Sequence, residues 1–380
     1  MSGHAKQVAR AKIARLAGRG LDLVSFWRES SEVLASAVPY YWAPCWYSLD
    51  PASLLVTSHF NEDMPEIPNE WLAQEYYADD VNKLADVARS ARGISTLHEA
   101  TGGNPTSSPR WHENMTYGAD QELAAALRTN AGDVWGGLGL YREVGQPLFE
   151  RQELEFIQAV VPYLAEGARR ALIVGEATDP QGPDAPGLVV LSDTWEVESS
   201  TPGAERWMSE LPDGDWAAGK LPSSVLSVAG RALRTAESPD EPGEIAVSRV
   251  LSRSGTWIVL HGASLVVAGS RRVAVIVEPA HPARISALLM SAYELSEREQ
   301  DVTRLVLQGS STTEIAKQLF VSPHTVQQHL KAVFEKTGVR SRRELVGKVF
   351  FSHYEPRVRD NERRVIEGQP VRGGPFDGGT

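Results

Sequence analysis

Apolar side chains in the first half of the chain change their spacing from segment to segment, and each spacing predicts one kind of element. Between residues 21 and 38 they recur at helical intervals, whereas the runs 45–49 and 53–58 contain the apolar and aromatic residues typical of strands. A further strand is expected at 134–142, and a long helix with one apolar face at about 149–172. Helices and strands mixed in this order predict an α+β domain.

A segment rich in proline and glycine, DPQGPDAPG at 179–187, interrupts this pattern and predicts a linker. Short strands at 188–191 and 195–198 follow it. The next elements are expected to be helices at about 203–211 and 222–236, then strands at 245–251, 256–261 and 272–277. We therefore expect two α+β domains, at residues 21–175 and 186–280.

Capping signals divide residues 290–352 into the four helices of an all-α domain. Three serines stand three residues before a glutamate, in the S-x-x-E pattern of a helix start: Ser296, Ser311 and Ser341. Ser322 precedes a proline, which favours the first position of a helix. The helices are expected at 296–307, 311–319, 322–336 and 341–351. Because the turn at 319–322 is short, the second and third helices are predicted to form a helix-turn-helix.

The net charge of −11 is unevenly distributed along the chain. Residues 21–289 hold 19 Lys and Arg against 37 Asp and Glu, a net of −18, while residues 315–350 hold seven against two, a net of +5. Salt screens each charge over roughly 10 Å, so a local basic surface decides the affinity for phosphates. The first 20 residues are predicted to be a basic arm, and the tail at 353–380 to be poorly ordered.

Composition and motifs exclude several other classes of protein. A single cysteine, Cys45, rules out an internal disulfide framework, and no apolar run approaches the roughly 18 residues that cross a bilayer, which predicts a cytoplasmic protein. The segment GDWAAGK at 214–220 nearly matches a phosphate-binding loop, but Leu221 replaces the hydroxyl that would hold magnesium. The run GGLG at 136–139 is interpreted as a packing feature. We expect no catalytic site, no metal site and no cofactor.

Polar residues of the third predicted helix in the C-terminal domain are candidates for contacting DNA. The amides of Gln327 and Gln328 can hydrogen-bond adenine, and Lys331 can reach guanine acceptors in the major groove. Three more residues are placed to meet phosphates, namely Thr325, His329 and Lys336. The alternative interpretation is a small helical bundle used for contacts with other proteins.

Four motifs in this domain resemble the LuxR-type helix-turn-helix: E-x-x-V at 299–302, T-x-E-I-A at 312–316, S-x-x-T-V-x-x-H-L at 322–330 and G-V-x-S-R at 338–342. The resemblance implies that the third helix enters the major groove and that the fourth helix contributes a dimer contact. The DNA-contacting residues are then Thr312, Lys317, Thr325, Gln327, Gln328, His329, Lys331, Lys336, Arg340 and Arg342. The dimer contacts are the apolar residues of the fourth helix, Leu345, Val346, Val349 and Phe350. Gln327 and Gln328 stand where basic or small apolar residues are common, so the operator sequence cannot be taken from relatives.

The order of elements in residues 21–175 resembles a GAF domain, and that of residues 186–280 resembles a PAS domain. Together these resemblances imply a one-component transcriptional regulator whose sensor domains control the helix-turn-helix. The implied partners are double-stranded DNA with an approximately palindromic operator, a second copy of the chain, RNA polymerase and a small-molecule effector, without a membrane.

Three questions stay open at the level of the sequence. The chain is alternatively an anti-activator that does not bind DNA, or a redox- or haem-based sensor that uses His59, His98 or His112. Six of the ten tryptophans lie within residues 27–135, where they either fill a core or line a ligand pocket. Activation or repression and the target genes cannot be derived from these patterns.

Overall fold

The computed structural model describes residues 3–62, 68–174, 186–237, 244–267, 270–280, 282–347 and 365–367. These residues form two compact units. The N-terminal unit contains residues up to 174 together with 186–252 and 258–278, and the C-terminal unit contains the helices from residue 282 onward. The α+β class is confirmed, with two antiparallel sheets and their helices followed by a helical C-terminal region. Most of the predicted linker and tail lie outside the described residues.

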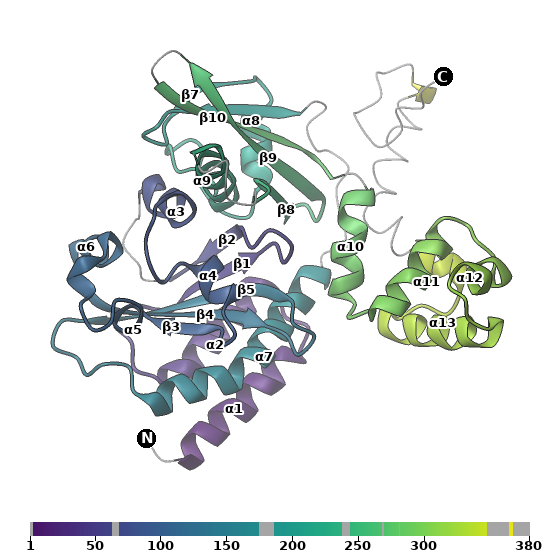
Figure 1. Ribbon diagram of the computed structural model, residues 1–380, viewed down its shortest axis with the longest axis horizontal. Helices are drawn as coiled ribbons and strands as arrows, with labels where there is room; N and C mark the ends of the chain where they lie inside the picture. The colour runs from purple at the N-terminus through teal and green to yellow at the C-terminus, as the bar shows by residue number, and fades with distance from the viewer. Residues whose placement is uncertain are drawn as a thin grey trace. The chain divides into compact units, whose positions relative to one another are not determined.

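The first sheet of the N-terminal unit has five antiparallel strands in the order β2-β1-β5-β4-β3 (Figure 1). Its strands are β1 (Cys45–Leu49), β2 (Val56–Phe60), β3 (Ile94–Thr96), β4 (Ala119–Arg128) and β5 (Val134–Glu143). The strands predicted at 45–49 and 134–142 are confirmed, and the one predicted at 53–58 begins three residues later. β3 and β4 were not predicted.

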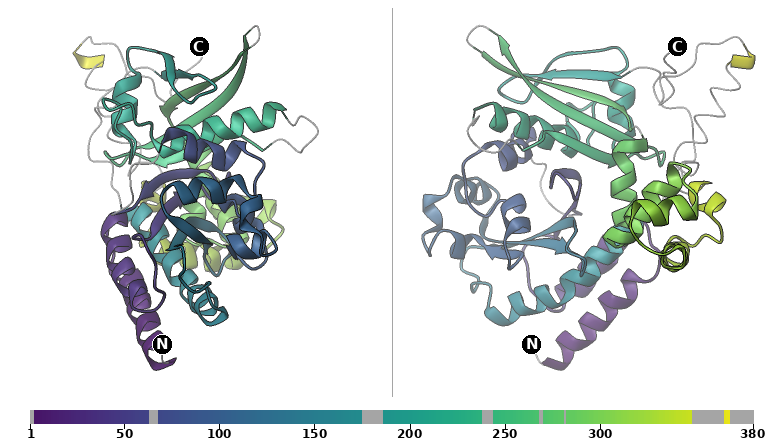
Figure 2. Two further views of the ribbon diagram at one scale, coloured as in Figure 1. Left: turned by 90° about the vertical axis from the view of Figure 1, so that its left-hand side faces the viewer. Right: turned by 45° about the vertical axis from the view of Figure 1, so that its right-hand side comes forward.

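Helices cover both faces of this sheet. On one face lie α1 (Gly3–Ala17), α2 (Leu23–Ala35) and α7 (Arg151–Val174), with α1 running alongside α7 (Figures 1 and 2). On the other face lie α3 (Asn69–Tyr77) and α4 (Leu84–Arg89). Three short helices complete the set, namely α5 (Leu97–Ala100), η1 (Pro105–Ser107) and α6 (Pro109–Thr116). The basic arm predicted at 1–20 is thus mostly a packed helix.

Side chains of β4 alternate between the two apolar clusters, as the pleat of a strand requires. Leu123 and Leu127 pack with the cluster under α1, α2 and α7, whereas Ala124 and Ala126 belong to the cluster on the opposite face. Because both faces of the sheet are covered, the central strands are buried over almost their whole length. At Gly137 of β5 a Cβ atom would lie 2.5 Å from a methyl carbon of Leu84, which confirms that GGLG is a packing feature.

The second sheet repeats the strand order of the first, because its order is β7-β6-β10-β9-β8. Its strands are β6 (Gly187–Leu191), β7 (Val197–Ser200), β8 (Val247–Leu251), β9 (Trp257–Val267) and β10 (Ser270–Pro279). In both sheets the strand that is last in sequence lies in the middle, between the first and the fourth. All five strands were predicted, each within a few residues of its observed start.

The two sheets share one apolar cluster. Two helices follow β7, α8 (Ala204–Glu210) and α9 (Ser223–Glu237), and α9 packs against α3 of the first sheet. A Cβ atom at Gly230 would lie 2.3 Å from the Ala73 carbonyl oxygen, so this close approach requires glycine. The shared cluster joins side chains of both sheets, among them Tyr47, Trp71, Tyr76, Val189, Trp207 and Val225. The regions expected as separate domains at 21–175 and 186–280 are therefore packed as one unit.

A buried ion pair also joins the two sheets. Asp50 follows β1 and has a 1% exposed side chain, while Arg249 of β8 is 13% exposed. The Arg249 backbone N–H and Nε donate to Asp50 Oδ2 at 3.0 and 2.9 Å, and Nη2 donates to Oδ1 at 2.5 Å. Three hydrogen bonds thus hold one carboxylate across the junction.

From residue 282 onward, the regular elements of the C-terminal unit in the described residues are all helices. They include α10 (Pro282–Ala292), α11 (Glu297–Leu307), α12 (Thr312–Gln318), α13 (Pro323–Thr337) and α14 (Arg342–Val346). The expected caps are present: Ser296 and Ser311 form complete capping boxes with Glu299 and Glu314, and Ser322 and Ser341 accept the backbone N–H three residues later. Since each cap depends only on residues close in sequence, the helix starts could be predicted.

Candidate nucleic-acid interface

A tight turn sets the angle between α12 and α13. Phe320 adopts a left-handed backbone conformation, with a φ of 56°, and its side chain is 95% exposed. The Val321 N–H returns to the Ala316 carbonyl oxygen at 3.0 Å. Ser322 then starts α13 by accepting the Thr325 N–H at 3.0 Å. The predicted turn at 319–322 is therefore present, and it reverses the chain between the two helices.

Buried side chains on three helices fix α13 in place. Val326, Leu330 and Val333 of α13 are at most 2% exposed, and they form one face of the helix. The partner helices α11 and α12 pack against α13 and supply buried residues of their own, namely Val302, Val306, Ile315 and Ala316. The opposite face of α13 is consequently left to solvent.

Polar side chains occupy that outer face. Gln327, Gln328 and Lys331 are exposed, as expected from the sequence. The Gln328 Nε2 lies 3.2 Å from the His324 Nε2, one turn earlier. Lys331 has an 81% exposed side chain, and its Nζ lies 3.9 Å from Oε1 of Glu335, which is also exposed. An ion pair so long and so solvated contributes little, so the ammonium can reach an acceptor elsewhere.

Three residues predicted separately meet at the start of α12. Thr312 Oγ1 accepts from Gln327 Nε2 of α13 at 3.2 Å and lies 3.4 Å from Arg342 Nη1 of α14. Arg342 also donates to the Ser310 carbonyl oxygen. The sequence identified all three side chains but did not predict that they form one contact. Arg342 is half-buried and stabilises the domain through these bonds, and its contact with DNA stays a prediction.

Lys336 has a structural role that the sequence did not indicate. Its Nζ donates to the Glu294 carbonyl oxygen at 2.8 Å and to Glu299 Oε2 at 2.7 Å, so it ties the end of α13 to the start of α11. Burial opposes ionisation of Glu299, yet the hydrogen bonds from Lys336 and from the Ser296 backbone lower the pKa of this carboxyl. The Lys336 ammonium is thus bonded within the domain while its side chain is 37% exposed, and its phosphate contact stays a prediction.

The remaining predicted residues differ in exposure. Lys317 and Arg340 are exposed, and Thr325 and His329 are half-buried. Leu345 was expected at a dimer contact, but it is 0% exposed and belongs to the core of the C-terminal unit. Val346 is half-buried, while Val349 and Phe350 lie outside the described residues. The fourth helix packs inward more than its apolar pattern alone indicated.

Comparison with known proteins identifies the family of this domain. Residues 293–349 match the family model for bacterial regulatory proteins of the luxR family. The chain is 40% identical over 52 residues to the spore germination protein GerE of Bacillus subtilis, covering 14% of this chain and 70% of that protein. The chain belongs to the LuxR family of bacterial regulatory proteins.

Other comparisons of the LuxR-family chain cover little of the relative's length or give a low structural score. The chain is 56% identical over 52 residues to an HTH-type transcriptional regulator of Mycobacterium bovis, but the match covers 14% of this chain and 6% of that protein. The chain thus spans about 6% of the length of the first curated relative it matches. The solved complex of E. coli DhaR(N) with DhaL matches 74% of this chain and 91% of its own, at 14% identity and a TM-score of 0.22. A score this low does not establish a shared fold.

The other motifs of this LuxR-family chain have structural explanations. Asp213, beside the near-match to a phosphate loop, accepts the N–H groups of Ser223 and His59 at 2.9 and 2.8 Å, so the start of α9 is already capped by a carboxylate. Burial raises the pKa of Asp213 and lowers that of His59 to about 4. Cys45 is fully buried, and burial raises its pKa to about 12, which makes it unreactive as a thiolate.

The clustered tryptophans of this LuxR-family chain mainly fill its core. Trp27, Trp46 and Trp135 are at most 1% exposed, and the rings of Trp27 and Trp46 stack with centroids 6.2 Å apart. His59, His98 and His112 lie in β2, α5 and α6, and among the described residues no group of three or more His, Cys, Asp or Glu is arranged to hold a metal. Within the same residues, no helix has the length and apolar character to cross a membrane.

Proposed function

We propose that this chain is a one-component transcriptional regulator that binds double-stranded DNA through α13. The observation that supports this best is the outer face of α13, where Gln327, Gln328 and Lys331 are exposed on a helix whose other face is packed. A helix held in this way can enter the major groove and present amide and ammonium groups to base edges. Lys317, Arg340, Thr325 and His329 are the proposed phosphate contacts beside it.

The substitutions Gln327→Ala and Lys331→Ala should each weaken operator binding by about 1–3 kcal/mol, because each removes a side chain that contacts a base edge. The operator is first obtained by genome-wide mapping of bound DNA. Band-shift titration of the purified variants at one salt concentration then measures the dissociation constants. Lys331→Ala should also reduce specificity at one base position.

The matched control is Arg151→Ala, which removes an exposed cation from α7 of the other unit, where the side chain is 90% exposed. Its operator affinity should equal that of the unchanged protein. If Gln327→Ala and Lys331→Ala both bind as tightly as the control, the groove assignment is wrong. If no DNA is recovered by mapping, the protein is better explained as an anti-activator that acts through protein contacts.

We further propose that the chain acts as a homodimer, with Val346, Val349 and Phe350 at the contact. A dimer reads two half-sites, so the operator should have approximate two-fold symmetry. Sedimentation velocity at micromolar concentration should show a dimer, at least on DNA, and Val346→Asp should weaken it. A monomer both free and on DNA would contradict this proposal.

The proposed sensors are the GAF-like region at 21–175 and the PAS-like region at 186–280, which would act on RNA polymerase through the DNA-bound domain. A ligand can change DNA affinity only if it prefers one of two arrangements of the protein. A coupling of about 1–3 kcal/mol corresponds to a 5- to 150-fold change in affinity. A Soret band in the purified protein would instead support the haem-based alternative.

A further inference from the structure

A cavity lies in the N-terminal unit, against the face of the first sheet that α3, α4 and α6 cover. It encloses about 340 Å³ of empty space, part of it open to solvent. Its interior is narrow, with room for only about one or two waters, so a ligand must be compact.

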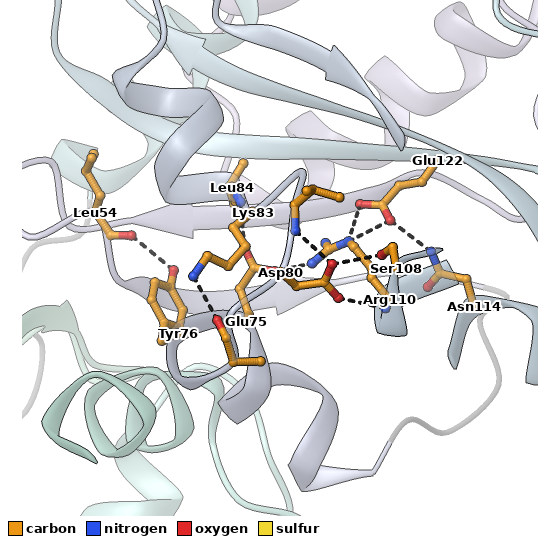
Figure 3. Close-up of polar contacts among 12 residues, drawn as sticks. Leu54, Glu75, Tyr76, Asp80, Lys83, Leu84, Ser108, Arg110, Asn114 and Glu122 are labelled. Atoms are coloured by element: carbon orange, nitrogen blue, oxygen red, sulfur yellow. Dashed lines mark hydrogen bonds and ion pairs between the residues drawn. The ribbon is translucent and has the colours of Figure 1, made fainter. Parts of the chain in front are cut away.

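Three charged side chains from three elements line this cavity (Figure 3). Arg110 begins α6, Glu75 lies on α3 and Glu122 lies on β4. Arg110 Nε donates to both oxygens of Glu122 at 2.9 and 2.7 Å, and Nη1 donates to Glu75 Oε2 at 2.5 Å. The side chains are 13%, 6% and 1% exposed, in the order Arg110, Glu75, Glu122. We call Glu75, Arg110 and Glu122 the buried triad.

Surrounding groups fix the geometry of the buried triad. Asn114 Nδ2 donates to Glu122 Oε2 at 2.8 Å, and the Leu84 N–H donates to Glu75. Asp80 holds the first turn of α6, because it accepts the Arg110 backbone N–H at 2.7 Å and the Ser108 hydroxyl at 2.8 Å (Figure 3). Each carboxylate of the triad is thus positioned by two or more donors before any ligand enters.

The lining of the cavity contains two carboxylates but only one cation. Burial works against the charge on Arg110, but attraction to Glu122 and Glu75 outweighs it and raises the pKa of the guanidinium. Tyr141, which also lines the cavity, is 1% exposed, and burial raises the pKa of its phenol well above the usual value, so it stays neutral. A buried charge without compensation is costly, so the cavity favours a positively charged occupant.

Aromatic rings surround the same space. Trp71, Tyr47 and Tyr141 all line the cavity. The guanidinium carbon of Arg110 already lies 5.9 Å from the centroid of Trp71, which shows that a cation is accommodated beside this ring. Aromatic faces attract organic ammonium ions, most strongly where water is excluded. Carboxylates and rings around one narrow space form a recognition site for such an ion.

We propose that this cavity binds a compact organic ammonium ion, whose charge is compensated by Glu75 and Glu122 and whose apolar part lies against Trp71 and Leu72. This assigns a site and a ligand class to the sensing role given under Proposed function, and it rests on that role. Binding itself, however, can be measured on the full chain without DNA.

The experiment compares three compact probes on the whole chain: methylammonium, methanol and formate. Differential scanning fluorimetry measures the shift in Tm, and tryptophan emission, to which Trp71 contributes, gives a second readout. Methylammonium should raise the Tm in a saturable way and change the emission, while methanol and formate should do neither. Equal responses to all three probes, or no response to methylammonium, would overturn the proposal.

Variants connect the response to the buried triad. Glu75→Gln keeps the shape and removes one negative charge, so affinity for methylammonium should fall at least tenfold. Glu155→Gln, on the exposed surface of α7, is the matched control and should bind normally. If Glu75→Gln does not fold, Ala124→Val narrows the same cavity and should also abolish the response. If the unchanged protein binds DNA but does not respond to the amine, only this inference is refuted, whereas absence of DNA binding by the unchanged protein refutes the proposed function.

Discussion

Replacing Arg110 by leucine should lower the free energy of unfolding by about 3–5 kcal/mol, because it leaves Glu75 and Glu122 buried with no cation between them. Urea denaturation of the full chain, followed by tryptophan emission, measures the change. The affected side chains and nine of the ten tryptophans belong to the N-terminal unit. Unfolding of this unit therefore dominates the change in tryptophan emission.

Two controls separate the charge effect from loss of packing. Arg151→Leu removes an arginine whose pair with Glu155 is solvent-exposed, and its unfolding midpoint should be unchanged. The triple variant Arg110→Leu, Glu75→Gln, Glu122→Gln removes the uncompensated carboxylates and should recover part of the lost stability. If Arg110→Leu costs less than about 1 kcal/mol, these carboxylates are not held in an apolar environment.

Replacing Asp50 by alanine should cost a similar amount, about 3–5 kcal/mol, because it leaves the Arg249 guanidinium and backbone N–H without their common acceptor. The damage should be local to the junction of the two sheets. Hydrogen exchange followed by mass spectrometry should therefore show faster exchange in β8 and in the turn between β1 and β2.

Asp79→Ala is the matched control, since Asp79 is 94% exposed and lies 3.8 Å from Arg234. Its exchange pattern should match that of the unchanged protein. Unaltered exchange in β8 of the Asp50→Ala protein would mean that the shared apolar cluster alone holds the sheets together, and that the ion pair contributes no stability.

The C-terminal helices could be predicted because their signals are local. Each start is marked by a serine cap and, in two cases, by the glutamate three residues later. The inward faces of α11, α12 and α13 follow from helical spacing alone. Helical spacing does not reveal which exposed groups already have partners in the fold. Lys336, for example, donates to Glu294 and Glu299, which lie 42 and 37 residues earlier in the chain. The sequence pattern therefore identified a cation but not its role.

In the N-terminal unit, tertiary contacts override local preference. β4 has the sequence ADQELAAALR, whose alanines, leucines and glutamate favour a helix, yet it forms a ten-residue strand between β5 and β3. Pairing with β5 and burial on both faces decide the outcome. The buried triad was missed for a related reason: Arg110 follows a stretch that resembles a loop, and its partners lie 35 and 12 residues away on other elements.

The strand order shared by the two sheets has a consequence for how the chain folds as it is synthesised. In each sheet the middle strand, β5 or β10, is the last to leave the ribosome, so neither sheet can close until its fifth strand has emerged. Until α9 has emerged, the first sheet's half of the shared apolar cluster lacks its cover, and the nascent chain exposes Trp71 and Tyr76 on α3. Because every strand of both sheets precedes α13 in the chain, the N-terminal unit can be complete before that helix is synthesised.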